Sequence, residues 1–250
     1  MIARFIPTPT VSQISVGPLT VHAYALCIIL GATLAVWLTN KRFISSGGNS
    51  ETVTDLALWV IPGGVIGARL YHVITSPEYF FGANGKLSDV FKIWEGGLGI
   101  WGAIAGGALV AIWKYKDPLP FTYLMDAIAP ALLIAQGIGR FGNWFNGELY
   151  GRPTDLPWAL KLSDGATYHP TFLYEALCNF ALAYVLIRLT GKFKTGSLFY
   201  IYVAGYCTYR FFIEGIRIDE AHTFAGLRLN QWVSLALGST ALAKFIQSRR

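Results

Sequence analysis

Long apolar segments separated by shorter polar stretches run along the whole chain. Each holds about 20 residues with few charges, the length that an α-helix needs to cross the roughly 30 Å hydrocarbon core of a bilayer. The segments cover approximately residues 20–40, 54–75, 97–115, 121–139, 171–190, 196–216 and 228–247. The pattern therefore predicts an all-α integral membrane protein, a bundle of about seven transmembrane helices that forms a single transmembrane domain over residues 1–250.

The positive residues between these segments predict the orientation of the bundle. They follow the first, third, fifth and seventh segments, at Lys41, Arg42, Lys114, Lys116, Lys192, Lys194, Lys244, Arg249 and Arg250. Cytoplasmic loops carry the excess of lysine and arginine in membrane proteins. We therefore expect the N-terminus outside and the C-terminus in the cytoplasm, with an extracytoplasmic arm over 1–19 and a small extracytoplasmic head over 141–170.

Composition supports a membrane protein and argues against other classes. Hydrophobic residues make up 54% of the chain and charged residues 14%, whereas soluble domains carry about a quarter charged residues. The net charge of +6 does not indicate nucleic-acid binding, because no basic run is interleaved with aromatic residues. Cys27, Cys178 and Cys207 lie in predicted helices without metal-ligand spacing, so we expect buried thiols and no metal site. Gly63/Gly67 and Gly102/Gly106 have the spacing of closely packed membrane helices.

Ionisable residues inside the apolar segments are the main functional candidates, because charges are costly in hydrocarbon. Arg210, Glu214 and Arg217 are spaced i, i+4 and i+7, which places them on one helical face. The apolar segments and their ends also hold Arg69, Asp126, Arg140 and Glu175. The predicted topology puts all of them except Asp126 in the outer half of the membrane, where they could converge on one cavity. We expect Asp126 to be structural.

Two interpretations of these charges compete. Arg210, Glu214 and Arg217 could merely pair with each other and extend toward the membrane interface. Against this, the arginines outnumber the nearby carboxylates, with Arg69, Arg140, Arg210 and Arg217 facing Glu148, Glu175 and Glu214. A surplus of buried positive charge favours an anion, and planar guanidinium groups suit bidentate phosphate recognition. We therefore favour a site for a phospholipid headgroup.

The densest group of polar side chains lies in 139–151, where the fourth segment leaves the membrane. Arg140, Asn143, Asn146 and Glu148 offer charge and amide hydrogen bonds, and the glycines between them allow tight turns. Residues 137–142 also spell GxGxxG, but they follow an apolar helix rather than a strand, which excludes a dinucleotide site.

This segment closely resembles the signature of prolipoprotein diacylglyceryl transferases. The resemblance covers nearly the whole chain, through further matching segments at 21–24, 67–71, 94–97, 169–175 and 205–217. It implies transfer of a diacylglyceryl group from phosphatidylglycerol to the lipobox cysteine of preprolipoproteins, the first step of bacterial lipoprotein maturation. The implied partners are phosphatidylglycerol, preprolipoprotein signal peptides and the lipid bilayer, in the bacterial plasma membrane and without a cofactor.

The resemblance also implies roles for particular residues. Arg140 and Arg210 would clamp the phosphate, while Glu148 would orient an arginine or accept the thiol proton, and His169 would act as a base or only cap the following helix. The remaining expected substrate-binding residues are Tyr24, Arg69, Asn143, Asn146, Gly151, Tyr206, Glu214 and Arg217. Glu214 and Arg217 would hold Arg210 in place.

One position departs from the family pattern. Trp101 stands where well-known members carry a histidine proposed as a catalytic base, so a base at that position is not available here. Two other classes fit the sequence less well. A transporter would show inverted repeats or a charge trail across the membrane. An aspartic membrane protease would need two neighbouring aspartates near the outer face, where Asp126 is not expected.

Overall fold

The computed structural model describes residues 5–17, 19–81 and 85–249. Its α-helices are α1 (Ala23–Ser45), α2 (Thr52–Thr75), α3 (Glu78–Phe81), α4 (Ile100–Lys114), α5 (Phe121–Asn146), α6 (Thr171–Arg188), α7 (Ser197–Ile216) and α8 (Leu229–Ser248). Two 3₁₀ helices, η1 (Leu87–Phe91) and η2 (Ile93–Glu95), follow α3. A helix occurs at each of the seven predicted positions, and the short α3 is additional.

The all-α prediction omitted several short strands. Among the described residues these are β1 (Ile6–Pro7), β2 (Gln13–Val16), β3 (Leu19–His22), β4 (Leu160–Lys161), β5 (Thr167–Tyr168), β6 (Thr223–Phe224) and β7 (Leu227–Arg228). They form one three-stranded sheet in the order β1-β4-β5 and two hairpins, β2-β3 and β6-β7. The two-residue strands are too short to show an alternation of apolar and polar residues. Strands β2 (QISV) and β3 (LTVH) do alternate, and the prediction missed this signal because it assigned the segment to an extracytoplasmic arm and the start of a helix. The fold is mostly helical rather than all-α.

Four of the described helices, α1, α2, α5 and α6, are long and apolar enough to cross a membrane. The apolar α4 has only 15 residues. Crossing of the membrane by α4, α7 and α8 therefore stays a prediction. Long apolar side chains on the crossing helices remain exposed, such as Leu58 at 69% and Ile29 at 62%, as expected of surfaces that face lipid.

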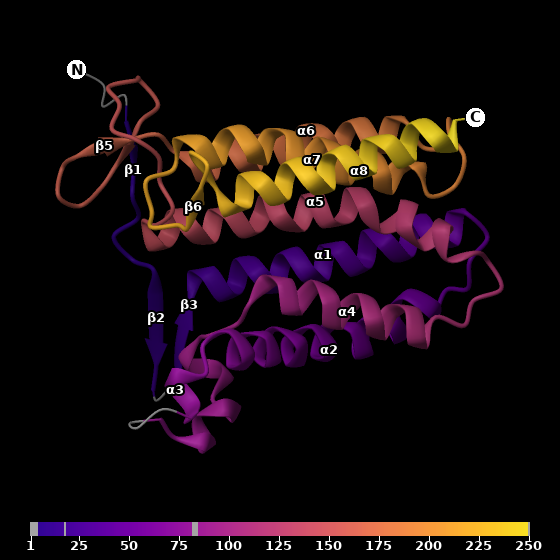
Figure 1. The fold of residues 1–250 in the computed structure, drawn as a ribbon, viewed down its shortest axis with the longest axis horizontal. Helices are drawn as coiled ribbons and strands as arrows, with labels where there is room; N and C mark the ends of the chain where they lie inside the picture. The colour runs from indigo at the N-terminus through magenta and orange to yellow at the C-terminus, as the bar shows by residue number, and fades with distance from the viewer. Residues whose placement is uncertain (1–4, 18, 82–84, 250) are drawn as a thin grey trace. The chain divides into compact units, whose positions relative to one another are not determined.

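The chain forms two compact units, each described here by itself. One contains the described residues up to Thr39 and from Thr122 onward, and the second contains those of Asn40–Phe121. In the first unit α5, α6, α7 and α8 run along one another, and the β1-β4-β5 sheet lies at one end of them (Figure 1). Its core is formed by apolar residues of α5, α6 and α7, with Leu133 and Leu186 completely buried.

The N-terminal arm belongs to the first unit. Strand β1 pairs in parallel with β4, and the Trp144 indole of α5 donates a hydrogen bond to the Pro7 carbonyl at 2.9 Å. The arm and the segment after α5 thus form one small structure at the end of the helices. The same end holds the C-terminus of α7 and the start of α8, joined by the β6-β7 hairpin.

Helix α5 is longer than predicted. The expected end at residue 139 is wrong, because the helix continues to Asn146. The glycines in this stretch do not break it; they let neighbouring side chains approach the backbone. A Cβ at Gly137 would overlap the Phe180 ring of α6, and one at Gly142 would overlap the Tyr24 ring of α1.

Asp126 has the structural role expected for it. Its carboxylate accepts hydrogen bonds from the backbone N–H groups of Gly196 at 2.8 Å and Phe199 at 3.2 Å. These are unpaired donors at the N-terminus of α7, where the helix dipole also favours a negative charge. Asp126 therefore fixes the start of α7 against α5.

In the second unit, α2 and α4 pack through glycines. A Cβ at Gly67 would overlap the Gly102 carbonyl, and a Cβ at Gly106 would lie 2.6 Å from the Gly63 oxygen. This confirms the close packing predicted from the spacing of these residues. Because no side chain separates the two backbones, dispersion contacts run along the whole pair.

We expect Gly67→Ala to destabilise the protein by about 1–3 kcal/mol, because the added methyl group overlaps a backbone carbonyl that cannot turn aside. Gly64→Ala is the matched control on the same helix, since its Cβ would lie 3.4 Å from the Ala103 oxygen. Thermal unfolding of both variants in detergent measures the difference. Equal midpoints would contradict the glycine contact.

Candidate functional site

The polar motif of 139–151 ends α5 with a defined turn. Gly147 has φ +63°, and the N–H groups of Gly147 and Glu148 donate to the carbonyls of Trp144 and Asn143. This is the Schellman pattern, in which a left-handed residue, usually glycine, closes a helix. The turn brings the Glu148 carboxylate back over the last turn of α5. There its Oε1 accepts from the amides of Asn143 at 2.8 Å and Asn146 at 3.1 Å.

Tyr24, at the start of α1, belongs to the same region. Its ring lies directly on the backbone of Gly142, where a side chain would overlap it. The tyrosine is 37% exposed, while the neighbouring Asn143 is buried. The structure thus gathers Asn143, Asn146 and Glu148 in one group and places Tyr24 on the neighbouring Gly142, while their binding of substrate stays a prediction.

Arg140 and Arg210 share one buried carboxylate. Glu175 of α6, whose side chain is 2% exposed, lies 2.6 Å from the Nε of Arg140 and 2.5 Å from the Nη1 of Arg210. Two arginines from α5 and α7 are thereby held on the two oxygens of one glutamate. The arginines predicted to form the phosphate clamp are therefore neighbours.

A second group of ion pairs continues along α7. The buried Glu214 lies 2.7 Å from Arg210 Nη2, 3.6 Å from Arg217 Nη1 and 3.1 Å from Arg228 Nε. Arg217 also donates two hydrogen bonds to Asp219, at 2.7 and 2.8 Å. Arg210, Glu214 and Arg217 thus do pair with each other, as one interpretation of the sequence held.

The ion-paired side chains described above form one group, called here the arginine cluster. Ion pairing leaves part of its positive charge unneutralised and at least one guanidinium N–H group without a partner among the described residues. The described members that are joined directly by ion pairs are four arginines and three carboxylates, Arg140, Arg210, Arg217, Arg228, Glu175, Glu214 and Asp219, which leaves a surplus of one positive charge among them. Glu148 is linked to Arg140 only through Asn143 and is not counted. Arg140 has the most exposed arginine side chain of the cluster, at 21%. Its Nη2 donates to no residue in the described parts of the chain. The cluster therefore offers an accessible, unsatisfied donor to an anion.

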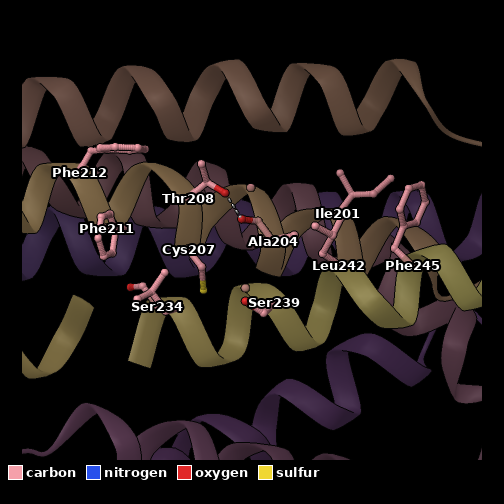
Figure 2. A pocket seen from close by; sticks show the side chains of 13 residues that line it. Ile201, Ala204, Cys207, Thr208, Phe211, Phe212, Ser234, Ser239, Leu242 and Phe245 are labelled. Carbon is pink, nitrogen blue, oxygen red and sulfur yellow. Dashed lines mark hydrogen bonds between the residues drawn. The ribbon is translucent and has the colours of Figure 1, made fainter. Parts of the chain in front are cut away.

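An apolar groove of about 500 Å³ lies between α7 and α8 (Figure 2). Two of its hydroxyl groups are satisfied within their own helices, as Thr208 donates to the Ala204 carbonyl at 2.8 Å and Ser234 to the Asn230 carbonyl at 2.7 Å. No charged side chain lines it. The groove is therefore not the anion site.

Comparison with known proteins decides the family. A family model described as prolipoprotein diacylglyceryl transferase matches residues 10–247. A protein of Bifidobacterium adolescentis named phosphatidylglycerol–prolipoprotein diacylglyceryl transferase is 48% identical, over 98% of this chain and 80% of its own length. Proteins of that name from Streptomyces griseus subsp. griseus and Corynebacterium glutamicum are 49% and 45% identical, over 98% and 96% of this chain and 78% and 83% of their own lengths. The chain belongs to the prolipoprotein diacylglyceryl transferase family.

Membership in the transferase family confirms the resemblance based on the motifs, and the expected site residues come from both compact units. Arg69 lies in the second unit, where its guanidinium donates to the carbonyls of Asp89, Val90, Gly96 and Gly97. These bonds tie the segment after α2 to the helix. Substrate binding by Arg69 stays a prediction, as do the functional roles of the other site residues.

His169 and Gly151 lie beside the end of α7. His169 Nδ1 is hydrogen-bonded to the Tyr174 hydroxyl at 3.1 Å, so this nitrogen contacts a side chain rather than the first N–H groups of α6. Gly151 donates from its N–H to the His169 carbonyl at 2.9 Å. A Cβ at Gly151 would lie 2.9 Å from the His169 Cβ, so glycine is needed for this close contact.

Tyr206 lies one turn from Arg210 on α7, in a row of aromatic rings. Its ring centroid is 6.1 Å from that of Tyr202 and 5.3 Å from that of Tyr209. The Tyr209 hydroxyl donates to the buried Asn179 at 2.6 Å. Tyr206 is thus part of the packing beneath the arginine cluster.

Three members of the cluster were absent from the predicted site residues of this transferase family member. Glu175 was recognised as an ionisable residue in a helix, but its position between two arginines depends on the packing of three helices. Asp219 follows Arg217 by two residues and had no helical spacing to mark it. Arg228 is the first residue of the last predicted segment, 228–247, where a positive residue is ordinary.

Glu175→Gln tests the shared carboxylate. We expect a loss of about 3–5 kcal/mol, because removing one partner leaves two buried arginines facing each other. Glu220→Gln, an exposed position after α7, is the control and should leave stability unchanged. Unfolding of purified protein in detergent measures both, and an unchanged midpoint in Glu175→Gln would contradict the pairing.

The pH dependence of stability tests Asp219, which lies beyond the end of α7. Burial opposes its ionisation, but hydrogen bonds and charge from Arg217, together with Arg228, lower its pKa below the usual value. A lowered pKa stabilises the fold above the unfolded pKa and loses this effect as pH falls through the folded pKa. The advantage of wild type over Asp219→Asn should therefore be full at neutral pH and shrink below about pH 4.

Thermal unfolding of wild type and Asp219→Asn between neutral and acidic pH measures this difference. Asp155→Asn, at an exposed carboxylate, serves as the control. A difference that stays constant down to acidic pH would contradict the role of the Asp219 charge.

Proposed function

We propose that the protein is a phosphatidylglycerol–prolipoprotein diacylglyceryl transferase. It transfers the diacylglyceryl group of phosphatidylglycerol to the lipobox cysteine thiol of a preprolipoprotein. The observation that carries the proposal is the arginine cluster, in which Arg140 and Arg210 are held on Glu175 with one positive charge in surplus. Family membership supplies the reaction, and the cluster supplies a site for its phosphate.

The reaction is an attack of a thiolate on a saturated carbon. A carbon–sulfur bond forms, the carbon–oxygen bond to the phosphate breaks, and glycerol phosphate leaves with the electron pair of that bond. The thiol must give up its proton, and the negative charge growing on the leaving phosphate must be stabilised. Groups that bind this charge more strongly in the transition state than in the ground state accelerate the reaction.

Arg140 and Arg210 meet the demand for charge stabilisation. The unsatisfied Nη2 of Arg140 binds a phosphate oxygen, and Arg210 faces the same oxygens from α7. Asn143, Asn146 and Tyr24 bind other headgroup oxygens at the end of α5. Glu214 and Arg217 keep Arg210 in position, while Gly151 and Tyr206 shape the surrounding site, and Arg69 contributes to substrate binding.

Proton removal is the step with two candidates. Glu148 has an exposed carboxylate within the amide cluster of Asn143 and Asn146. His169 is the second candidate, through its Nε2. Nearby arginines assist either of them, because cations lower the pKa of a thiol from its usual value of about 8.5. The indole of Trp101 does not accept a proton, so the charge clamp carries more of the catalysis.

The proposed setting is the bacterial plasma membrane. Seven helices cross it as a single transmembrane domain, with the N-terminus outside and the C-terminus in the cytoplasm. The β1-β4-β5 sheet and the arginine cluster lie at the same ends of α5, α6 and α7, which this topology places on the outer side. An exported lipobox cysteine and the outer-leaflet lipid both reach that side.

The test combines purified protein, phosphatidylglycerol vesicles and a lipobox peptide. Mass spectrometry should show that the peptide gains one diacylglyceryl group. Arg140→Ala and Arg210→Ala should each lower the rate by about 10²–10³-fold, because each removes a donor to the developing charge. Arg188→Ala, an exposed arginine at the opposite end of α6, should keep the wild-type rate.

Other outcomes would overturn the proposal. Cleavage of the peptide would indicate a protease. An unchanged peptide would show that the protein does not catalyse the transfer. Full activity in both Arg140→Ala and Arg210→Ala would refute the clamp while leaving the transfer itself in place.

A further inference from the structure

Arg228 occupies the junction between the β6-β7 hairpin and α8. The hairpin turns through Ala225 and Gly226, which both have positive φ, at +48° and +78°. Two such residues in succession make the tight turn that suits a two-residue hairpin. Arg228 ends β7, and its backbone N–H donates to the Gln231 side chain at 3.0 Å. The backbone of Arg228 is thereby fixed on both sides.

The side chain of Arg228 extends from this fixed point to three groups. Its Nε lies 3.1 Å from Glu214 Oε1, its Nη1 donates to the Arg217 carbonyl at 2.9 Å, and its Nη2 donates to Asp219 Oδ2 at 2.9 Å. Nη2 also donates to the Asp219 carbonyl at 2.8 Å. The side chain is only 12% exposed. A planar guanidinium with several donors is suited to holding such a set together.

Glu214 divides its two oxygens between the two sides of the cluster. Oε1 faces α8, where it contacts Arg228 and accepts from the Asn230 amide at 3.2 Å. Oε2 faces α7, where it lies 2.7 Å from Arg210. Glu214 therefore stands between Arg228 and Arg210, and its side chain is 1% exposed. The orientation of this carboxylate sets the position that Arg210 can adopt.

We infer that Arg228 is a positioning residue for the transfer reaction, acting on Arg210 through Glu214. This inference rests on the proposed function, because it concerns the arginine that faces the leaving phosphate. Without Arg228, Glu214 Oε1 loses its cation, and the terminal torsion of a glutamate turns easily. The carboxylate would then redistribute toward Arg210 and Arg217, and Arg210 would lose its alignment.

A purely structural role makes a different prediction. Arg228 also links the end of α7 to the hairpin, so its loss lowers the unfolding midpoint in either case. A structural role would reduce the amount of folded enzyme and leave kcat per folded molecule unchanged. A positioning role lowers kcat itself. A misaligned Arg210 still binds the substrate but loses part of the extra stabilisation that it gives to the transition state.

The first experiment compares Arg228→Gln with wild type in vesicles that contain phosphatidylglycerol, using a lipobox peptide and the full chain. We expect kcat per folded molecule to fall about 10–100-fold, the loss that is typical when a residue orienting a metal ligand in an enzyme is removed. KM for phosphatidylglycerol should change by less than about threefold. Arg152→Gln is the control, because exposed Arg152 bonds to the Gly215 carbonyl at the same end of α7 without touching Glu214.

The second experiment places Arg228→Gln in a Glu214→Gln background, under single-turnover conditions that keep slow rates measurable. If Arg228 acts through Glu214, the second substitution should lower the rate by no more than about twofold. If Arg228→Gln lowers the rate in the Glu214→Gln background as much as it does in wild type, the inference is overturned. A kcat of Arg228→Gln within about twofold of wild type would overturn it as well. If Arg228→Gln does not fold, Arg228→Lys, which lacks the guanidinium fork, carries the same two comparisons.

The measurement on wild-type enzyme distinguishes failure of this inference from failure of the proposed function. A wild-type enzyme that adds no diacylglyceryl group would overturn the proposed function. A wild-type enzyme that adds the group, with an equally fast Arg228→Gln, would overturn only the role of Arg228.

Discussion

The contact of Glu175 with Arg140 and Arg210 connects three helices at one point. Each of these side chains would be costly in an apolar interior without its partner. The glutamate comes from α6 and the arginines from α5 and α7, so the ion pairs form only when all three helices are in register. The end of α5, the start of α6 and the last turns of α7 are therefore fixed together, and the Schellman turn and the hairpin before α8 build on that arrangement.

Much of the helical fold could be predicted from the sequence, because apolar segments of sufficient length are unambiguous. The errors lay where local rules are weak. The predicted segment 121–139 stopped before the polar motif, yet α5 continues to Asn146. Glycine inside a helix is tolerated when another side chain packs against it, as the Tyr24 ring does on Gly142. Strands of two residues, such as β1 and β4, leave no periodic signal.

The candidate site was only partly accessible to the same reasoning. Spacing placed Arg210, Glu214 and Arg217 on one face, because that is a property of a single helix. It could not assign the partners, since Arg210 bonds across to α6 and Glu214 bonds across to the start of α8. Arg228 is 11 residues from Arg217 along the chain and meets its carbonyl only through the hairpin. Contacts between elements depend on tertiary packing that no local pattern reports.

The surplus of one positive charge in the arginine cluster has a consequence for the order of events. In the proposed reaction, the phosphodiester headgroup carries one negative charge, so the cluster would be neutral with the lipid bound. After transfer, the phosphate is a monoester, whose charge at neutral pH approaches −2 because its second pKa is about 6. The cluster with bound product is then net negative. In the proposed reaction, a positive cluster attracts the dianionic product more strongly than the monoanionic lipid. The charge that helps the phosphate to leave carbon would therefore also hold the product, which makes its release a slow step of turnover.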